Sequence, residues 1–446
     1  MPTLNKIGTV LSRSHHIPID PALRRLRLAL TVFFAVDGFL FAGWVVRIPA
    51  IKAQVGASAG QLGLALLGVS AGAVATMLLT GRLCRMFGSE RVTVVTGVML
   101  ALSIALPPRT HSALGLGLVL LLFGISYGGL NVAMNSVAVD LVAALRRPVM
   151  SSFHAAYSLG GLLGSGIGGL LAPHLSPATH LLLLTPVGLV AVALAGRPLL
   201  AHPLRRPERG RRAVVPASAS ASAPAQPRNS SAPAEPRDSS AAAKAPATGT
   251  TAGTAAAPSR AGGTTLLVAV FGLIAACTAY GEGALAEWGP LHIQQDLHGG
   301  PGIAAAGYSA VTLAMTLGRL SGTTLLVRLG QTRALVLGGL TACTGMLVGA
   351  LAPYLPLVMI GFALTGLGLA NLFPTAIARA GELTGPSGVA AASTLGYGGL
   401  LLGPPSIGFL TDAFGLPSAL TTVAALAAVA AVIAYLARNS GARQDG

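Results

Sequence analysis

The chain is poor in charge: only 9% of its 446 residues are Asp, Glu, Lys or Arg, whereas 53% are hydrophobic. Soluble domains carry roughly 25% charged residues, so this composition argues against a soluble fold. Cysteine is scarce as well. Cys84, Cys277 and Cys343 are widely separated and odd in number, which indicates neither a disulfide framework nor a zinc site.

Motifs for nucleotide hydrolysis and catalysis are missing. The three lysines are Lys6, Lys52 and Lys244, and none lies in a phosphate-binding Gly-x-x-x-x-Gly-Lys loop. The His-Glu-x-x-His and Gly-x-Ser-x-Gly motifs are also absent. We therefore expect no ATP use, no enzymatic activity, no catalytic residues, no metal and no cofactor. A membrane-embedded sensor without transport stays open as a different class of function.

Long apolar stretches are abundant instead: twelve of them, six before and six after a polar gap. A helix needs about 20 mostly apolar residues to cross a bilayer. The pattern predicts an all-α membrane protein with twelve transmembrane helices. The predicted spans are 28–46, 62–80, 92–106, 114–133, 149–171, 181–195, 266–285, 303–326, 334–351, 357–377, 389–410 and 419–436.

The same pattern predicts the domain organisation. Residues 28–196 and 264–436 form two six-helix bundles, flanked by an N-terminal tail, 1–27, and a C-terminal tail, 437–446. The gap between them, 197–263, is rich in Ala, Pro, Ser and Thr with interspersed Arg. Such a composition buries too little apolar surface to offset the cost of ordering, so we predict a disordered linker.

Basic residues collect on one side of the predicted helices. All but Arg47, Lys52 and Arg109 of the 29 Lys and Arg residues lie on the side of the tails and the linker. By the positive-inside rule, the termini and the linker are cytoplasmic in a multi-pass plasma (inner) membrane protein. This placement accounts for the net charge of +16, and no basic module with interleaved aromatics indicates nucleic acid.

The two halves resemble each other. Gly-Arg-Leu occurs at 81–83 and again at 318–320, each time before a predicted loop, and glycine clusters occur at 160–164 and 398–403. Two echoes at matching places predict a duplicated six-helix unit. In transporters of this plan, the substrate site lies near the middle of the membrane between the halves.

The segment 81–88, Gly-Arg-Leu-Cys-Arg-Met-Phe-Gly, resembles the loop motif between helices 2 and 3 of the major facilitator superfamily. Arg85 stands where that motif has Asp. The resemblance covers the chain outside the N-terminal tail and the linker, and it implies secondary transport by alternating access. It assigns a set of residues to a cytoplasmic loop motif: Gly81, Arg82, Arg85, Gly88, Arg91, Gly318 and Arg319.

Within that superfamily, several segments are similar to the fucose-permease-like branch: 44–51, 131–135, 153–160, 282–288 and 396–405. In that branch a helix 4 carboxylate is linked to proton coupling. The match places Asn131 at that position, and an amide releases no proton at working pH. If transport is proton-coupled, another acid has to titrate.

Three acidic residues lie within the predicted helices: Asp37, Glu282 and Glu287. Ionisable side chains are costly inside a membrane and usually mark a functional path, so these three are the candidates for proton coupling. Asp37 and Glu282 lie in helices 1 and 7, which are equivalent in the two repeats. The alternative is a structural acid that is permanently hydrogen-bonded to a neighbouring helix.

Polar and aromatic residues in the predicted helices suit a hydroxyl-rich, sugar-like solute. Some share a helical face by spacing, such as Asn131 with Asn135. The alternative is hydrogen bonding between helices for the polar residues and anchoring at the membrane surface for the aromatics. The candidates for substrate binding are Trp44, Asn131, Asn135, His154, Tyr157, Ser158, Trp288, Asn371 and Tyr397.

The direction of transport stays open. The glycine-rich segment 160–169 is similar to the helix 5 motif of drug and proton antiporters, with Ser165 in place of Pro. The sequence thus predicts a monomeric secondary transporter that moves a small polar organic solute together with protons. Proton-antiport efflux of drugs or metabolites is the alternative.

Overall fold

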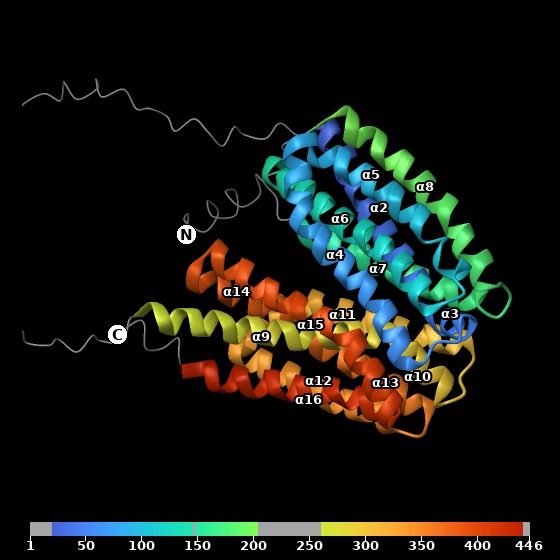
Figure 1. Ribbon diagram of the computed structural model, residues 1–446. Helices are drawn as coiled ribbons and strands as arrows, with labels where there is room; N and C mark the ends of the chain where they lie inside the picture. Colours follow the sequence, from blue (N-terminus) through green and yellow to red (C-terminus); the bar gives the residue numbers. More distant parts are fainter. Residues whose placement is uncertain (1–19, 146–148, 204–259, 440–446) are drawn as a thin grey trace, which may run out of the picture. The chain divides into compact units, whose positions relative to one another are not determined.

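The computed structural model describes residues 20–145, 149–203 and 260–439. The described chain is nearly all helical (Figure 1). Most of the predicted linker and most of the two predicted tails lie outside the described residues. The helices that border the linker and the N-terminal tail reach further than predicted: α8 continues to Ala201, α9 begins at Arg260, and α2 begins at Pro21.

The first half of the chain contributes seven α-helices and one short 3-10 helix, η1, at Pro107–Arg109. The α-helices are α2 Pro21–Val45, α3 Ile48–Val55, α4 Ala59–Phe87, α5 Ser89–Ser103, α6 Ala113–Leu145, α7 Met150–Leu171 and α8 Pro177–Ala201.

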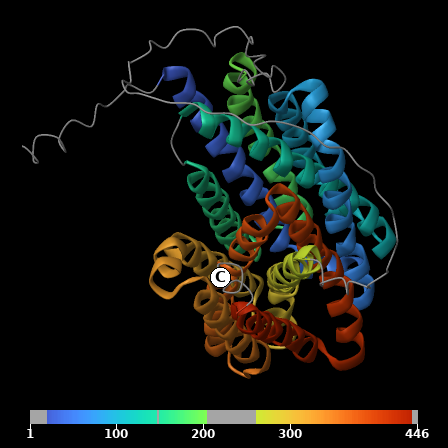
Figure 2. The ribbon, with the colours of Figure 1, turned by 90° about the vertical axis from the view of Figure 1, so that its left-hand side faces the viewer.

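The second half contributes eight α-helices and a 3-10 turn, η2, at Ala437–Asn439. The α-helices are α9 Arg260–Glu287, α10 Gly289–Gln295, α11 Pro301–Leu329, α12 Gln331–Leu351, α13 Leu355–Leu369, α14 Leu372–Thr384, α15 Pro386–Phe414 and α16 Leu416–Leu436. Figure 2 shows the helices of the first half, in blue to green, and those of the second half, in yellow to red, as two groups.

Ten helices of the described chain are long and apolar enough to cross a membrane. Helices α7 and α15 also coincide with predicted spans but fall outside this set, because their many glycine and hydroxyl residues lower the mean hydropathy. One predicted span, 357–377, is not a continuous helix. It breaks into α13 and α14 at Ala370 and Asn371.

Corresponding junctions in the two halves use the same local chemistry. Helices α4 and α11 each have 29 residues and end at Gly88 and Gly330. These glycines have φ values of 88° and 76°, a left-handed backbone that side chains disfavour. The following helices, α5 and α12, begin at once, so the sharp connection depends on glycine. These junctions coincide with the loops predicted after the repeated Gly-Arg-Leu segments.

Glycines bring α2 and α7 into close contact. A Cβ at Gly160 would collide with the backbone oxygen of Ala35, and one at Gly164 with that of Phe39. On the other side, a Cβ at Gly38 would strike the backbone oxygen of Tyr157. Small residues of α7 thus permit a close backbone approach to α2, and this packing fixes the positions of Asp37 and Tyr157 relative to each other.

Candidate functional site

Asp37 is fully buried in the middle of α2. Neither of its carboxylate oxygens has a hydrogen-bond partner among the described residues. The hydroxyls of Tyr127 on α6 and Tyr157 on α7 lie close enough to interact with it electrostatically. Burying an unpaired carboxylate is costly in its ionised form, so Asp37 is favoured as the neutral acid in this conformation.

Four tyrosines come from both halves, and we call them the tyrosine cluster: Tyr127, Tyr157, Tyr308 and Tyr397. Of these, Tyr127 and Tyr157 interact electrostatically with Asp37. The Tyr127 and Tyr157 hydroxyls are 2.9 Å apart. Tyr308 on α11 and Tyr397 on α15 lie within electrostatic range of Tyr127. The cluster therefore presents hydroxyl groups and aromatic rings from four helices, the combination that a hydroxylated solute requires.

Glu282 on α9 forms an ion pair with Arg319 on α11. The Nη2 of Arg319 lies 3.2 and 3.3 Å from the two carboxylate oxygens of Glu282. The side chains of Arg319 and Glu282 remain 40% and 30% exposed, although both lie within long helices. His154 on α7 and Tyr308 lie within electrostatic range of Arg319. A charged pair is thus accessible beside the other half of the molecule.

Asn371 supports this pair from the break between α13 and α14. Its Nδ2 donates to the backbone oxygen of Gly318 at 2.8 Å, and the Nε of Arg319 donates to the backbone oxygen of Ala370 at 3.4 Å. The predicted substrate-binding candidate Asn371 therefore holds α11 in position, and the neighbouring Ala370 carbonyl orients Arg319.

The structure places Gly318 and Arg319 inside α11 rather than in a loop, which corrects the prediction from the loop motif. Arg319 lies ten residues before the end of the helix at Leu329. In the first half, the motif residues lie at the end of α4 and the start of α5, and the side chains of Arg82, Arg85 and Arg91 are exposed.

Three other predicted candidates are buried in the core. Trp44 is buried in the last turn of α2 and Trp288 at the break between α9 and α10, with 2% and 1% exposure. Glu287, at the end of α9, is also buried, and its Oε2 has no hydrogen-bond partner among the described residues. In this conformation the two indole rings pack in the core and present no face to a solute.

The polar candidates of α6 and α7 differ in their exposure and in their partners. Asn135 donates from Nδ2 to the backbone oxygen of Asn131 at 2.8 Å, a bond within one helix. Ser158 is buried, whereas His154 is exposed and meets Phe34 edge-on at 5.4 Å between ring centroids. Of these residues, His154 lies within electrostatic range of Arg319.

Arg47 has a structural place at the break between α2 and α3. Its Nε donates to Nδ1 of His180 on α8 at 2.8 Å, and its Nη1 to the backbone oxygen of Ala172 at 3.4 Å. Burial lowers the pKa of Arg47 to about 10, so it still carries its charge at neutral pH. The contact ties the break to α8.

The two halves meet along α4 with α15 and along α7 with α11. Asp412, near the end of α15, accepts hydrogen bonds at the start of α4 from the Ser58 hydroxyl at 2.9 Å and from the backbone N–H groups of Ala59 and Gly60 at 2.9 and 2.7 Å. We call this set the Asp412 contact. It lies at the end of the helices where α3 and α10 touch each other (Figure 1).

A second contact between the halves joins Ser165 on α7 to Ser309 on α11, with 2.7 Å between the hydroxyl oxygens. Further along α4, the Ser70 hydroxyl donates to the backbone oxygen of Leu400 on α15 at 3.2 Å. Hydrogen bonds at helix ends and within the helices thus join the two halves.

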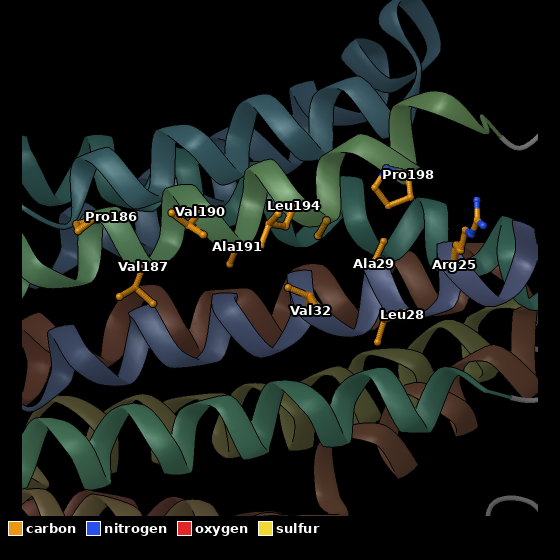
Figure 3. Close-up of a pocket in the computed structure, with 11 residues that line it drawn as sticks. Arg25, Leu28, Ala29, Val32, Pro186, Val187, Val190, Ala191, Leu194 and Pro198 are labelled. Atoms are coloured by element: carbon orange, nitrogen blue, oxygen red, sulfur yellow. The ribbon is translucent and has the colours of Figure 1, made fainter.

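A groove of about 740 Å³ lies between α2 and α8 (Figure 3). Apart from Arg25 at one end, apolar residues line it, which suits lipid chains rather than a polar solute. Its lining residues are Arg25, Leu28, Ala29, Val32, Pro186, Val187, Val190, Ala191, Leu194, Ala195 and Pro198. We therefore place the candidate site at the tyrosine cluster and the Glu282–Arg319 pair.

Sequence reasoning missed Tyr127, Tyr308 and Asp412. Tyr127 lies four residues before Asn131, and Tyr308 lies eleven before Arg319, so each shares a helical face with a residue already singled out. That spacing was a usable signal for the two tyrosines. Asp412 offered none, because its partners lie more than 350 residues away in the sequence.

The family model described as Major Facilitator Superfamily matches residues 28–330 and 271–445. An uncharacterised transporter, y4wD, of Sinorhizobium fredii is 30% identical over 407 residues, covering 90% of this chain and 95% of that protein. An uncharacterised MFS-type transporter of Yersinia pestis is 28% identical over 419 residues, with 93% and 96% covered. Membrane protein MosC of Rhizobium meliloti is 26% identical over 439 residues, with 95% and 96% covered.

Solved structures share the fold at low sequence identity. The nucleoside transporter NupG matches with a TM-score of 0.64 and 13% identity, covering 92% of this chain and 98% of that chain. A bacterial homologue of the human lysosomal transporter Spinster, in an inward-facing and unoccupied conformation, matches with a TM-score of 0.66 and 14% identity, covering 95% and 98%.

Proposed function

Because the chain belongs to the Major Facilitator Superfamily, we propose that it is a secondary active transporter that moves a small, polar, sugar-like solute across the membrane by alternating access. The observation that carries this proposal is the candidate site itself. The tyrosine cluster takes members from α6, α7, α11 and α15, and the accessible Glu282–Arg319 pair stands beside His154 of the first half. A site built from both halves changes its access when the halves move relative to each other.

We propose twelve membrane spans in two six-helix repeats, with α7 and α15 added to the ten apolar helices. The short helices α3 and α10 then lie outside the plasma membrane, and the termini and the 197–263 linker lie in the cytoplasm. The asymmetric placement of Lys and Arg supports this orientation. The Asp412 contact accordingly closes the outer end in this conformation.

Proton coupling is part of the proposal, with Asp37 and Glu282 as the principal carriers and Glu287 as a third candidate. Asp37 is buried without a hydrogen-bond partner among the described residues, so contact with water in another conformation would change its preferred protonation state. Glu282 is accessible here and paired with Arg319. The two acids therefore have contrasting environments in a single conformation.

Weakening the Asp412 contact is expected to favour opening at the outer end. The carboxylate of Asp412 accepts from the start of α4, where the helix dipole favours negative charge. Since Asp412 is exposed, its contribution is on the order of 1 kcal/mol, equivalent to about a fivefold change in an opening equilibrium. Asp412→Asn should raise the maleimide labelling rate of Ser70→Cys about fivefold, in a background without native cysteines.

The matched control is Thr411→Val, one residue away. The Thr411 hydroxyl donates to the backbone oxygen of Ile407 within its own helix, and no hydrogen bond joins it to α4 among the described residues. This variant should label at the parent rate. Equal labelling rates for Asp412→Asn and the parent would show that the contact does not hold the outer end closed.

Counterflow in proteoliposomes tests the transport function. The panel contains labelled uridine, L-fucose, D-glucose, D-glucosamine and D-glucuronate; uridine is included because NupG is described as a nucleoside transporter. We expect exchange of at least one solute, recovered chemically unchanged, and none in protein-free vesicles. Conversion of a solute without its movement, or movement of none, would contradict the proposal. A pH gradient applied in either direction then separates import from efflux by proton antiport.

A further inference from the structure

The Glu282–Arg319 pair has the geometry of an exchangeable contact. Its N–O distances of 3.2 and 3.3 Å exceed the 2.7–2.9 Å typical of tight charge-assisted hydrogen bonds. One guanidinium nitrogen, Nη2, serves both carboxylate oxygens, so the bidentate match of Arg with a carboxylate is not used. Among the described residues, none hydrogen-bonds the Nη1 of Arg319.

The backbone around Arg319 is fixed, although the ion pair of Arg319 with Glu282 is loose. Asn371 holds the Gly318 carbonyl, and the Ala370 carbonyl holds the Nε of Arg319. A Cβ at Gly322, one turn further along α11, would strike the Asn371 side chain, so the two segments are in close contact there. Arg319 is thereby held in position while its side chain remains 40% exposed.

The charge of Arg319 is permanent, because a guanidinium stays protonated at any working pH. A permanent charge in the middle of a membrane helix is costly unless a negative group accompanies it. Glu282 supplies that group in this conformation. A second carboxylate that offers two oxygens to Nη1 and Nη2 would satisfy the same charge with better geometry.

We propose that the transported solute is a hydroxylated carboxylate, and that its carboxylate replaces that of Glu282 on Arg319. This inference rests on the proposed transport function and names its substrate class. His154 and the tyrosine cluster provide donors and aromatic surfaces for the hydroxyl-bearing part of the solute. The ligand would then bridge the halves, because Arg319 belongs to the second half and His154 to the first.

Three sugars of matched size test the charge requirement. D-Glucuronate differs from D-glucose by a carboxylate in place of the hydroxymethyl group. D-Glucosamine differs from D-glucose by an amine in place of one ring hydroxyl. By isothermal titration to the purified full chain and by counterflow, we expect D-glucuronate to bind and exchange. The neutral and cationic sugars should do neither at the same concentration.

Two variants at the pair separate recognition from structural support. Arg319→Gln should weaken D-glucuronate binding about ten- to hundredfold, the range for hydrogen bonds to a charged group. Glu282→Gln should tighten D-glucuronate binding, because the competing carboxylate is gone; a purely structural pair gives no such gain. Arg328→Gln, at the far end of α11, is the control and should bind as the parent does.

Each outcome bears on the proposal. Failure of D-glucuronate to bind while uridine or a neutral sugar exchanges would overturn the carboxylate assignment and leave transport intact. Weaker or unchanged D-glucuronate binding in Glu282→Gln would also overturn it, and this variant decides the matter if Arg319→Gln does not fold. Movement of no solute in the panel would contradict the transport function itself.

Discussion

Asp37→Asn should abolish proton-driven accumulation of the transported solute while counterflow continues. The reason is the environment of the carboxyl group: it is fully buried and has no hydrogen-bond partner among the described residues. A buried carboxyl in this setting is favoured in its neutral form, which asparagine imitates in shape and polarity. The variant should therefore fold and bind, but it cannot exchange a proton between conformations.

Infrared difference spectroscopy gives a readout that needs no solute. The protonated carboxyl band of the parent in detergent should disappear in Asp37→Asn and persist in Asp20→Asn. Asp20 lies just before the same helix and only caps it, with its side chain accepting from the N–H of Ala22. Full accumulation in Asp37→Asn, or no loss of the band, would exclude Asp37 as the proton carrier.

Gly160→Leu should destabilise the protein more than any polar substitution in the candidate site. A Cβ at this position would collide with the backbone oxygen of Ala35 on α2, and backbone cannot move aside as a flexible side chain can. Overpacking of this kind costs about 1–3 kcal/mol and occasionally more. The steric conflict separates α2 from α7, so we expect a lower melting temperature and loss of the monodisperse peak in size-exclusion chromatography.

Gly166→Leu on the same helix provides the comparison. Nothing lies within 4 Å of a Cβ built at Gly166, so leucine has room there. Leucine also favours a helix over glycine by roughly 1 kcal/mol. This variant should melt at or above the parent temperature. If Gly160→Leu does the same, the contact of α2 with α7 does not require glycine.

The positions of the helices were predictable because a bilayer imposes a minimum apolar length. Each predicted span coincides with a helix or a broken helix. The exception in detail is 357–377, where Ala370 and Asn371 interrupt the helix between Leu369 and Leu372. Mean hydropathy registers apolar length but not a local turn, so this break could not be inferred from the apolar pattern.

The candidate site was only partly predictable. Asp37, Glu282 and Tyr157 stood out because polar groups are rare in membrane helices. Arg319 was assigned to the cytoplasmic loop motif because the Gly-Arg-Leu segment of that motif recurs at 318–320. Its pairing with Glu282 joins side chains of α9 and α11, a contact that the sequence pattern does not specify.

A reversible crosslink between Ser165→Cys and Ser309→Cys tests the claim of alternating access most directly. The two hydroxyl oxygens are 2.7 Å apart and join α7 to α11, toward the end that the Asp412 contact closes in our proposal. In a background without Cys84, Cys277 and Cys343, oxidation should stop counterflow and a reducing agent should restore it, while each single variant is unaffected. Undiminished counterflow in fully crosslinked protein would contradict the account, because the halves would then transport without separating at this end.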